Sequence, residues 1–243
     1  MSISSGYLTP EDSAARVHVF VDWATFPELF DGEALLEVRS DTGSIEVIHV
    51  SIKKRQIPVG FTGFVESDHF VSMKNTSFDA RSIAQSSYKA NSLIGRTGAG
   101  GVLLAAHPDD AENSIFLHYS FYNYTPMAEA TIILYFTMTI KAEPSNPIKY
   151  DICVDALPHS TFRLVPDASN PGTMPLGNLL AGWMEECPRL VRTRTHTIDL
   201  TKTGAHVLKI RLRHTNYVLE KFVIDLGGVR PSYLGPPESK RLK

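Results

Sequence analysis

Acidic residues that could act as paired acids and bases occur in two places. Asp109, Asp110 and Glu112 form an acidic turn, and Glu185 and Glu186 end a short helical segment. Hydrolysis of a glycosidic bond needs two carboxylates placed on either side of that bond. Carboxylates gathered in one turn or at one helix end are instead typical of solvated surface. No G-x-S-x-G nucleophile elbow occurs either, so we predict no catalytic residue in this chain.

Three other carboxylates could form a metal site. Glu66 and Asp68 alternate along one predicted strand, and Asp225 lies near the end of the last predicted strand. Carboxylate oxygens are hard ligands that suit Ca²⁺, so these residues predict a structural calcium site. The alternative is that all three are surface carboxylates or caps at strand ends. Apart from this calcium, the sequence predicts no required cofactor.

Aromatic and arginine side chains could hold a sugar. Exposed rings with polar partners line many such sites, and Trp183 on the short helix and Tyr233 near the C-terminus are the candidates for a groove wall. Arg96, Arg192 and Arg194 could each pair with a sugar carboxylate through a bidentate hydrogen-bonded fork. These five residues are the predicted carbohydrate-binding set.

Not every aromatic residue is a candidate for binding. Tyr119 and Phe121 should share one face of a predicted strand, and Tyr122 and Tyr124 should share the other. About half of this cluster is therefore expected in the core. The glycines of residues 95–101 precede a strand and lack the Gly-Lys-Ser/Thr ending of a phosphate-binding loop, which favours a tight turn.

Composition excludes several classes of protein. The chain has 243 residues, a formal net charge of -2, 43% hydrophobic and 21% charged residues. It has no long basic block of the kind that nucleic-acid binding needs. It also has no apolar run approaching the ~20 residues of a membrane span. Cys153 and Cys187 match no zinc spacing, and the sequence leaves open whether they pair.

Short strands must position these residues. In the first block, Arg16–Trp23, Ala34–Arg39 and Ile45–Ile52 alternate as half-buried strands do. Proline and glycine interrupt the pattern at Ile57–Gly60, and we place a domain boundary there, with residues 1–58 and 59–243 on its two sides. Three strands are marginal alone, so the first domain is expected to be a small immunoglobulin-like β domain or an incomplete one.

The second block predicts about eight strands and one helix. Phe64–Met73 opens it as one strand, residues 75–92 read as a loop with a short helix, and Leu179–Glu186 is the helix. The pattern closes with a hairpin whose turn is His214–Tyr217, followed by a docked tail that packs Tyr233 and Leu234. Strands at this spacing predict an all-β, jelly-roll-like sandwich. The remaining strands are predicted at Val102–Ala105, Ile115–Tyr124, Ala130–Ile140, Ile148–Val154, Thr161–Val165 and Thr193–Leu200.

The C-terminal motif carries a family resemblance. Val218–Asp225 followed by Gly227–Ser239, GGVRPSYLGPPES, resembles the end of glycoside hydrolase family 115, and the similarity extends upstream through Gly95–Gly98, the Trp183 helix and Gly204–Lys209. Enzymes of that family are xylan α-1,2-glucuronidases, which release glucuronic or 4-O-methylglucuronic acid from xylan. Their catalytic centre lies upstream of the matched region, so the resemblance implies a C-terminal accessory region and no catalytic residue. The chain departs from the family at His214-Thr215, where an Asp-Pro pair is expected.

The resemblance implies a non-catalytic role with three kinds of partner: glucuronoxylan, the catalytic domain of a parent enzyme, or a second copy in a homodimer. A purely structural module without glycan affinity is the alternative, and an independent hydrolase is the third hypothesis. The N-terminus lacks the basic region and apolar core of a signal peptide. Enzymes of the family are commonly extracellular, and the compartment stays open.

Overall fold

The computed structural model describes residues 21–27, 29–79, 88–98, 100–105, 115–139, 147–165, 186, 188–215 and 217–243. The chain forms two compact units, Met1–Val59 and Gly60–Lys243. Among the described residues, no helix is long and apolar enough to cross a membrane.

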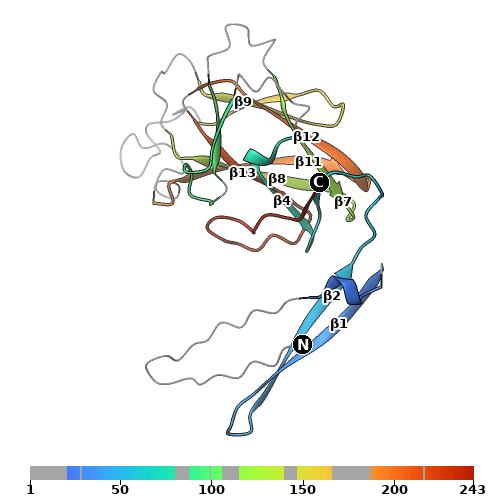
Figure 1. The fold of residues 1–243 in the computed structure, drawn as a ribbon. Coiled ribbons are helices and arrows are strands. Elements are labelled where there is room, and N and C mark those ends of the chain that lie inside the picture. The colour runs from blue at the N-terminus through green and yellow to red at the C-terminus, as the bar shows by residue number, and fades with distance from the viewer. Residues whose placement is uncertain are drawn as a thin grey trace. The chain divides into compact units, whose positions relative to one another are not determined.

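The first unit is built on one long hairpin (Figure 1). β1 (Phe30–Arg39) and β2 (Ile45–Lys54) pair antiparallel along their whole length, from Phe30 opposite Lys54 to Arg39 opposite Ile45. Two of the three predicted strands are therefore found. The third, Arg16–Trp23, lies largely outside the described residues, and its last residue begins the 3-10 turn η1 (Trp23–Thr25). Among the described residues of this unit, Ile52 alone is buried.

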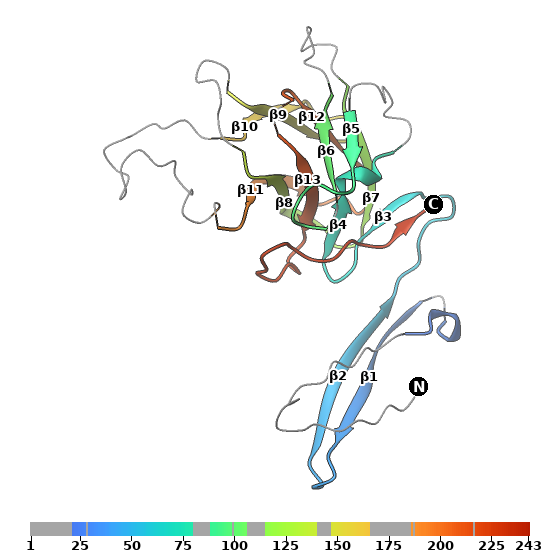
Figure 2. The same ribbon diagram turned by 60° about the vertical axis from the view of Figure 1, so that its left-hand side comes forward.

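The second unit is an all-β sandwich of two sheets, as predicted (Figure 2). We call them the β12 sheet, with strand order β10-β9-β12-β7-β3-β14, and the β13 sheet, with order β11-β8-β13-β6-β5 and β4 paired to β13. The elements are β3 (Gly63–Val65), β4 (Phe70–Lys74), η2 (Asn75–Ser77), β5 (Tyr88–Asn91), β6 (Gly101–Leu104), β7 (Leu117–Asn123), β8 (Met127–Thr137), β9 (Lys149–Val154), β10 (Ser160–Arg163), β11 (Val191–Leu200), β12 (Gly204–Leu212), β13 (Leu219–Asp225) and β14 (Arg241–Leu242).

The core lies between the two sheets because each long strand turns alternate residues inward. Along β7, Tyr119 and Phe121 are fully buried, whereas Tyr122 on the opposite face is only half-buried, which confirms the predicted division of this cluster. The Tyr119 ring packs edge-on against Phe222 of the β13 sheet, with ring centroids 4.6 Å apart. Such aromatic contacts between the layers join the two sheets into one core.

The predicted closing hairpin is wrong. β12 pairs with β7 and β9, whereas β13 pairs with β4, β6 and β8, so the connection between them crosses from one sheet to the other. Tyr217 explains why the chain crosses. Its side chain is buried in the core, and its hydroxyl donates to the Lys149 carbonyl and accepts from the Arg213 amide. The Tyr217 side chain therefore lies between the sheets.

The predicted strand Phe64–Met73 is also wrong as one strand, because it contains a tight turn between β3 and β4. Asp68 and His69 have φ of 49° and 58°, which ends the extended backbone. Ser67 and Phe70 close the turn by exchanging backbone hydrogen bonds of 3.0 and 3.1 Å. Residues 75–92, expected as a loop with a helix, contain η2 and β5, and of the predicted helix Leu179–Glu186 only Glu186 is described and it is helical.

Candidate functional site

The predicted arginines Arg192 and Arg194 meet at one carboxylate. Glu186 accepts from Arg192 Nε at 2.6 Å and from Arg194 Nη1 at 2.7 Å, and Arg194 Nε also donates to the Leu164 carbonyl at 2.8 Å. Both arginines lie on the inward-turned face of β11, opposite core residues of β8. Arg192 is only 1% exposed, whereas the Arg194 side chain is 20% exposed, so the pair lies largely within the edge of the sandwich, and its role in carbohydrate binding stays a prediction.

Tyr233 and Arg96 are more accessible. Tyr233 is 45% exposed and its hydroxyl donates to the Arg189 carbonyl, just before β11. The exposed Arg96 lies in a turn that Glu220 organises by accepting the Arg96 and Thr97 amides at 2.8 and 2.9 Å. The structure therefore joins two of the predicted residues at one carboxylate and anchors two others by separate contacts. Trp183 lies outside the described residues.

The predicted calcium ligands are engaged in turns. Glu66 accepts from the Tyr124 and Thr125 amides at 2.5 and 2.8 Å and from the Thr125 hydroxyl at 2.7 Å. Asp225 Oδ1 accepts from the Gly227 amide at 2.8 Å and the Val229 amide at 3.1 Å.

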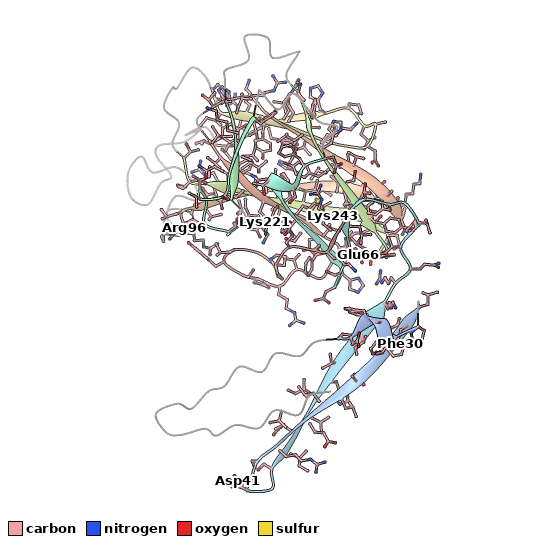
Figure 3. All side chains as sticks on the ribbon, in the orientation of Figure 1. Phe30, Asp41, Glu66, Arg96, Lys221 and Lys243 are labelled. Atoms are coloured by element: carbon pink, nitrogen blue, oxygen red, sulfur yellow. The ribbon has the colours of Figure 1, made fainter. Side chains whose placement is uncertain are left out.

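Asp68 does not share a strand face with Glu66, because it sits in the β3–β4 turn. Figure 3 places Glu66 and Arg96 in different parts of the sandwich. In the described part of the chain no three His, Cys, Asp or Glu side chains gather around a metal-sized site. Structural calcium stays a prediction, tested by metal analysis below.

The C-terminal segment 227–239, which we call the tail, covers the outer face of the β13 sheet. Phe70, Tyr135, Val191 and Val223 form an apolar cluster on that face, and Val229 and Leu234 of the tail pack on it together with Ile133. Backbone and side-chain hydrogen bonds between Ser72 and Ser239 fasten the end of the tail to β4. The tail is therefore docked, as predicted, through Leu234; the Tyr233 ring stays half exposed.

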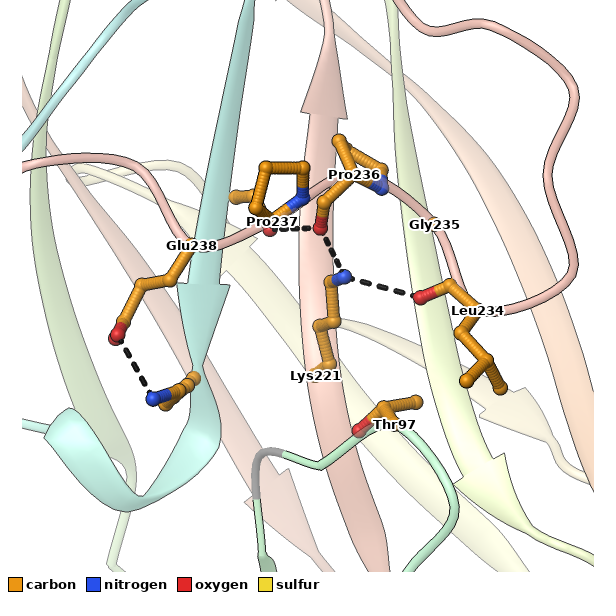
Figure 4. Close-up of a pocket in the computed structure, with 9 residues that line it drawn as sticks. Thr97, Lys221, Leu234, Gly235, Pro236, Pro237 and Glu238 are labelled. Carbon is orange, nitrogen blue, oxygen red and sulfur yellow. Dashed lines mark hydrogen bonds and ion pairs between the residues drawn. The ribbon is translucent and has the colours of Figure 1, made fainter. Parts of the chain in front are cut away.

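A lysine holds the tail from below (Figure 4). Lys221 Nζ donates to the carbonyl of Leu234 at 3.0 Å and to that of Pro236, and burial lowers the pKa of Lys221 to about 8, although the Glu238 carboxylate favours its charged form. The cavity beside it is about 110 Å³, whereas small-molecule pockets measure roughly 300–1,000 Å³. It is therefore too small for a sugar chain.

The outer face of the β12 sheet is charged. Asp151 of β9, fully buried, accepts from Arg211 Nε at 2.5 Å, from Arg213 Nε at 2.9 and 2.8 Å, and from the Thr161 hydroxyl at 2.6 Å. Burial by itself would raise the pKa of Asp151, but the hydrogen bonds from Thr161, Arg213 and Arg211 and the Arg211 charge outweigh it and lower the pKa. Asp151 therefore stays ionised.

Sequence reasoning missed this cluster. Lys209, Arg211 and Arg213 recur at every second position of the predicted strand, a spacing that puts three cations on one face. The apolar residues that alternate with these cations, Leu208, Ile210 and Leu212, give the strand its stronger pattern. Cys153 lies half-buried on the same face, and burial raises the pKa of its thiol. Its pairing with Cys187 stays open, because Cys187 lies outside the described residues.

The comparisons with known proteins give one family and a set of solved structures. Residues 63–238 match the model of the glycosyl hydrolase family 115 C-terminal domain. No curated protein sequence matches the chain.

Among solved structures, a family 115 4-O-methyl-α-glucuronidase with specificity for decorated arabinogalactans is similar over 71% of this chain and 19% of its own, with 10% identity and a TM-score of 0.47. The chain thus spans about a fifth of that enzyme's length. The Podospora anserina GH26-CBM35 β-(1,4)-mannanase is similar over 68% and 29%, with 12% identity and a TM-score of 0.40. The C-terminal CBM6 of a Zobellia galactanivorans laminarinase is similar over 64% and 98%, with 10% identity and a TM-score of 0.39.

Proposed function

The chain belongs to the family of glycosyl hydrolase family 115 C-terminal domains, and from that premise we propose that it is a non-catalytic accessory region that contacts polysaccharide by a surface of its sandwich. Family membership supports the accessory role. The glycan contact goes further and rests on the geometry of the sandwich faces.

One observation carries the proposal: the two outer faces of the sandwich differ in polarity and in whether the tail covers them. The tail covers the apolar outer face of the β13 sheet, and the cavity beneath the tail is small. The outer face of the β12 sheet instead presents the exposed Thr161 and Arg163 beside half-buried Lys149 and Lys209. A polar sheet face suits weak binding to the side of a long glycan better than enclosure of a single sugar.

Affinity electrophoresis and calorimetry of the whole chain with glucuronoxylan test this function. We expect retarded migration and a dissociation constant in the micromolar to millimolar range. Serum albumin run in the same gel controls for sieving by the polysaccharide. Absence of binding at millimolar sugar would remove the proposal. Release of glucuronic acid from decorated xylan oligomers by the purified chain would contradict the non-catalytic part.

A structural or interaction module is the second candidate, and the first unit supplies the observation that favours it. Five apolar side chains of the β1–β2 hairpin are each about half exposed: Leu35, Val38, Ile45, Val47 and Ile48. The strand register puts Leu35, Ile45 and Val47 on one face of the hairpin and Val38 and Ile48 on the other, and exposed apolar side chains that adjoin one another mark interaction surfaces. Light scattering after gel filtration tests this role. A dimer that Ile48→Lys converts to a monomer would favour it, and a wild-type monomer that does not bind the catalytic region of a parent enzyme would exclude it.

A further inference from the structure

We infer that the edge of β2 that faces away from β1 binds a second copy of this chain. In this pairing β2 runs antiparallel to β2 of the second copy, with a two-fold axis at Val50, and the two hairpins join into one four-stranded sheet. The inference rests on the interaction role, the second candidate function, and gives that role a surface, a partner and a register. It does not depend on the glycan-contacting function.

β2 has the features of an edge strand that accepts another chain. Among the described residues, β1 is the only strand that pairs with it. β2 is ten residues long and pairs with β1 without a bulge, whereas strands average about five or six residues. It has no proline, and its β-branched aliphatic residues are Ile45, Val47, Ile48, Val50 and Ile52. A long, regular and apolar edge is a site at which a second chain adds a strand.

The hairpin leaves apolar side chains of β2 in solvent on both of its faces. Val47 and Ile48 point to opposite faces and are 45% and 50% exposed. A two-stranded sheet is marginally stable in water and gains stability from further strands. Pairing of two β2 strands adds neighbours to both faces at once, because cross-strand side chains contact each other on each face.

The order of residues along β2 specifies one antiparallel register. On one face the strand reads Glu46, Ile48, Val50, Ile52 and Lys54, an acid and a base at the two ends of an apolar row. With the axis at Val50, Ile48 of each copy lies opposite Ile52 of the other, and Glu46 lies opposite Lys54. The two-fold symmetry forms both contacts twice, and opposite charges across a strand pair stabilise it.

Other registers of β2 lack this match. A two-fold axis perpendicular to the sheet must pass through a residue position, because opposite residues share a face. An axis at His49 or at Ser51 sets one of the charged end residues, Glu46 or Lys54, opposite an isoleucine. The register about Val50 therefore satisfies both the apolar and the charged positions.

β1 is less suited to the same pairing. The two antiparallel registers that overlap most of β1 have their axes at Ala34 and Leu35. They set Glu37 of each copy opposite Asp31 or Glu33 of the other, and like charges directly opposite destabilise a strand pair. The edge of β2 is therefore the self-complementary edge of the hairpin.

The charged groups at the ends of β2 are placed for this contact. Lys54 Nζ donates to the carbonyls of Trp23 at 3.0 Å and Phe26 at 2.9 Å. An ammonium group has three donors, so one N–H remains for a carboxylate. Glu46 is exposed, and within the described part of the hairpin the ion pairs include neither Glu46 nor Lys54. Each copy thus offers one acid and one base to the other.

A single cysteine tests the register. In a chain that carries Cys153→Ser and Cys187→Ser, Val50→Cys puts one thiol of each copy beside the axis, within the Cα separation of about 4.4–6.8 Å that a disulfide needs. Oxidation should link these chains into dimers on a non-reducing gel. Ile48→Cys in the same background is the control, since its two substituted positions lie about 13 Å apart along the paired strands and should stay unlinked.

Charge reversal tests the contact between Glu46 and Lys54. Light scattering after gel filtration should show a dimer of the whole chain, and Glu46→Lys or Lys54→Glu should weaken self-association at least about tenfold. An equimolar mixture of the two variants should recover the dimer, because every contact in the mixed pair again joins opposite charges. The control Glu129→Lys changes an exposed carboxylate of β8 and should leave association within about twofold.

The outcomes separate this inference from the functions proposed above. A wild-type chain that is monomeric at about 200 μM overturns it, as does a failure of Val50→Cys to cross-link or equal cross-linking of both cysteine variants. A mixture of folded charge variants that stays monomeric also overturns it. Thermal melts identify folded variants, and if Lys54→Glu does not fold, the two cysteine variants decide.

Each negative result has a different meaning for the rest of the molecule. A dimer without the expected cross-link overturns the β2 interface and leaves the interaction role to another surface. Binding of polysaccharide by a monomeric chain overturns the β2 interface and leaves the glycan-contacting function standing. Cross-linking through Val50→Cys alone, together with recovery of the dimer in the mixture, supports the β2 interface.

Discussion

The two outer faces of the sandwich differ in the side chains that they carry. The face of the β13 sheet carries an apolar cluster that includes Tyr135, Val191 and Val223, and the chain's own tail packs over it. The face of the β12 sheet is charged, and the buried Asp151 neutralises its arginines in place. Apolar packing under the tail stabilises the β13-sheet face, and ion pairs stabilise the β12-sheet face. The tail covers the apolar cluster of the β13 sheet, whereas polar side chains such as Thr161 stay exposed on the β12 sheet.

Tail packing and ion pairing are each vulnerable to a different kind of change. Burial of apolar area is insensitive to salt but depends on the tail staying in place. Buried ion pairs stabilise little in total, yet removal of one member leaves an uncompensated charge at high cost. The predictions below probe this difference from the largest expected effect to the smallest.

Deletion of residues 227–243 should have the largest effect, because it removes Val229 and Leu234 from the apolar face, takes β14 from β3 and leaves Lys221 without its carbonyl partners. We expect a loss of about 5 kcal/mol and a melting temperature lower by about 10–20 °C. Removal of the exposed Lys243 alone is the control and should change nothing. An unchanged melting temperature after the long deletion would mean that the tail serves a separate partner.

Asp151→Ala should be the next most severe change, because the almost fully buried Arg211 would lose its 2.5 Å ion pair with Asp151. Breaking a buried pair in this way costs about 3 kcal/mol, measured as a lower urea midpoint. The control Glu129→Ala removes a carboxylate exposed on β8 and should leave the midpoint unchanged.

The Asp151 carboxylate should also make the stability of the folded protein sensitive to acid. The pKa of Asp151 is lower in the folded protein, so its stabilisation is present above the unfolded-state value of about 4 and is lost as the pH falls through the lower folded value. Asp151→Ala should flatten the stability profile below pH 4. A profile as steep as that of the wild type would assign the acid sensitivity to other groups.

Gly235→Ala should destabilise the tail contact by about 2 kcal/mol, because a Cβ there would lie 2.5 Å from the Tyr135 hydroxyl. Gly98 is a matched control, since it has the same φ of +71° and nothing within 4 Å of its Cβ position. Gly98→Ala therefore measures the backbone cost alone. Equal melting temperatures for the two variants would show that the tail yields freely to the added methyl group.

Lys221, which holds the tail on the β13 sheet, should have a smaller effect on the melting temperature that depends on pH. Its pKa is about 8 in the folded protein, below the ordinary value of about 10.4, so between these values the unfolded chain binds more protons and rising pH stabilises the fold. The melting temperature should rise from pH 7.5 to 9.5 relative to that of Lys221→Met. Parallel pH profiles for the two proteins would contradict this assignment.

Chelation should have the smallest effect, because the oxygens of Glu66 and Asp225 already accept hydrogen bonds from backbone amides. We expect EDTA to leave the melting temperature unchanged. Stoichiometric calcium in the purified protein, together with a lower melting temperature in EDTA, would instead support the calcium prediction made from the sequence. Metal analysis before and after dialysis decides between these results.

Sequence patterns predicted the local structure well where it depends on alternation. The two faces of β7 divide Tyr119 and Phe121 from Tyr122 as expected, and most strands lie where apolar residues recur at every second position. The errors occurred where a turn has no strong local signal. Asp68 and His69 interrupt an apparently continuous strand with positive φ, a conformation that Asp and His adopt more often than most residue types but still too rarely to be predicted from residue type.

The predicted carbohydrate-binding residues show the same limit of local sequence patterns. The residue types of Arg192 and Arg194 predict carboxylate-binding forks, but both side chains lie on the inward face of β11 and pair with Glu186. The ion pairs of Arg211 and Arg213 depend on Asp151, which lies about sixty positions away along the chain, so the local sequence does not predict them. Pairing between remote strands cannot be read from either strand alone.

The sequence by itself determined the all-β class, the alternation of each strand, the docked C-terminal segment and the family to which the chain belongs, because these depend on residue type and local spacing. Only the tertiary structure decided that β12 and β13 belong to different sheets, that the tail covers one outer face, and that a buried aspartate orders the cations of the other. Those features depend on which distant strands become neighbours, and that choice is made by burial of the whole core at once.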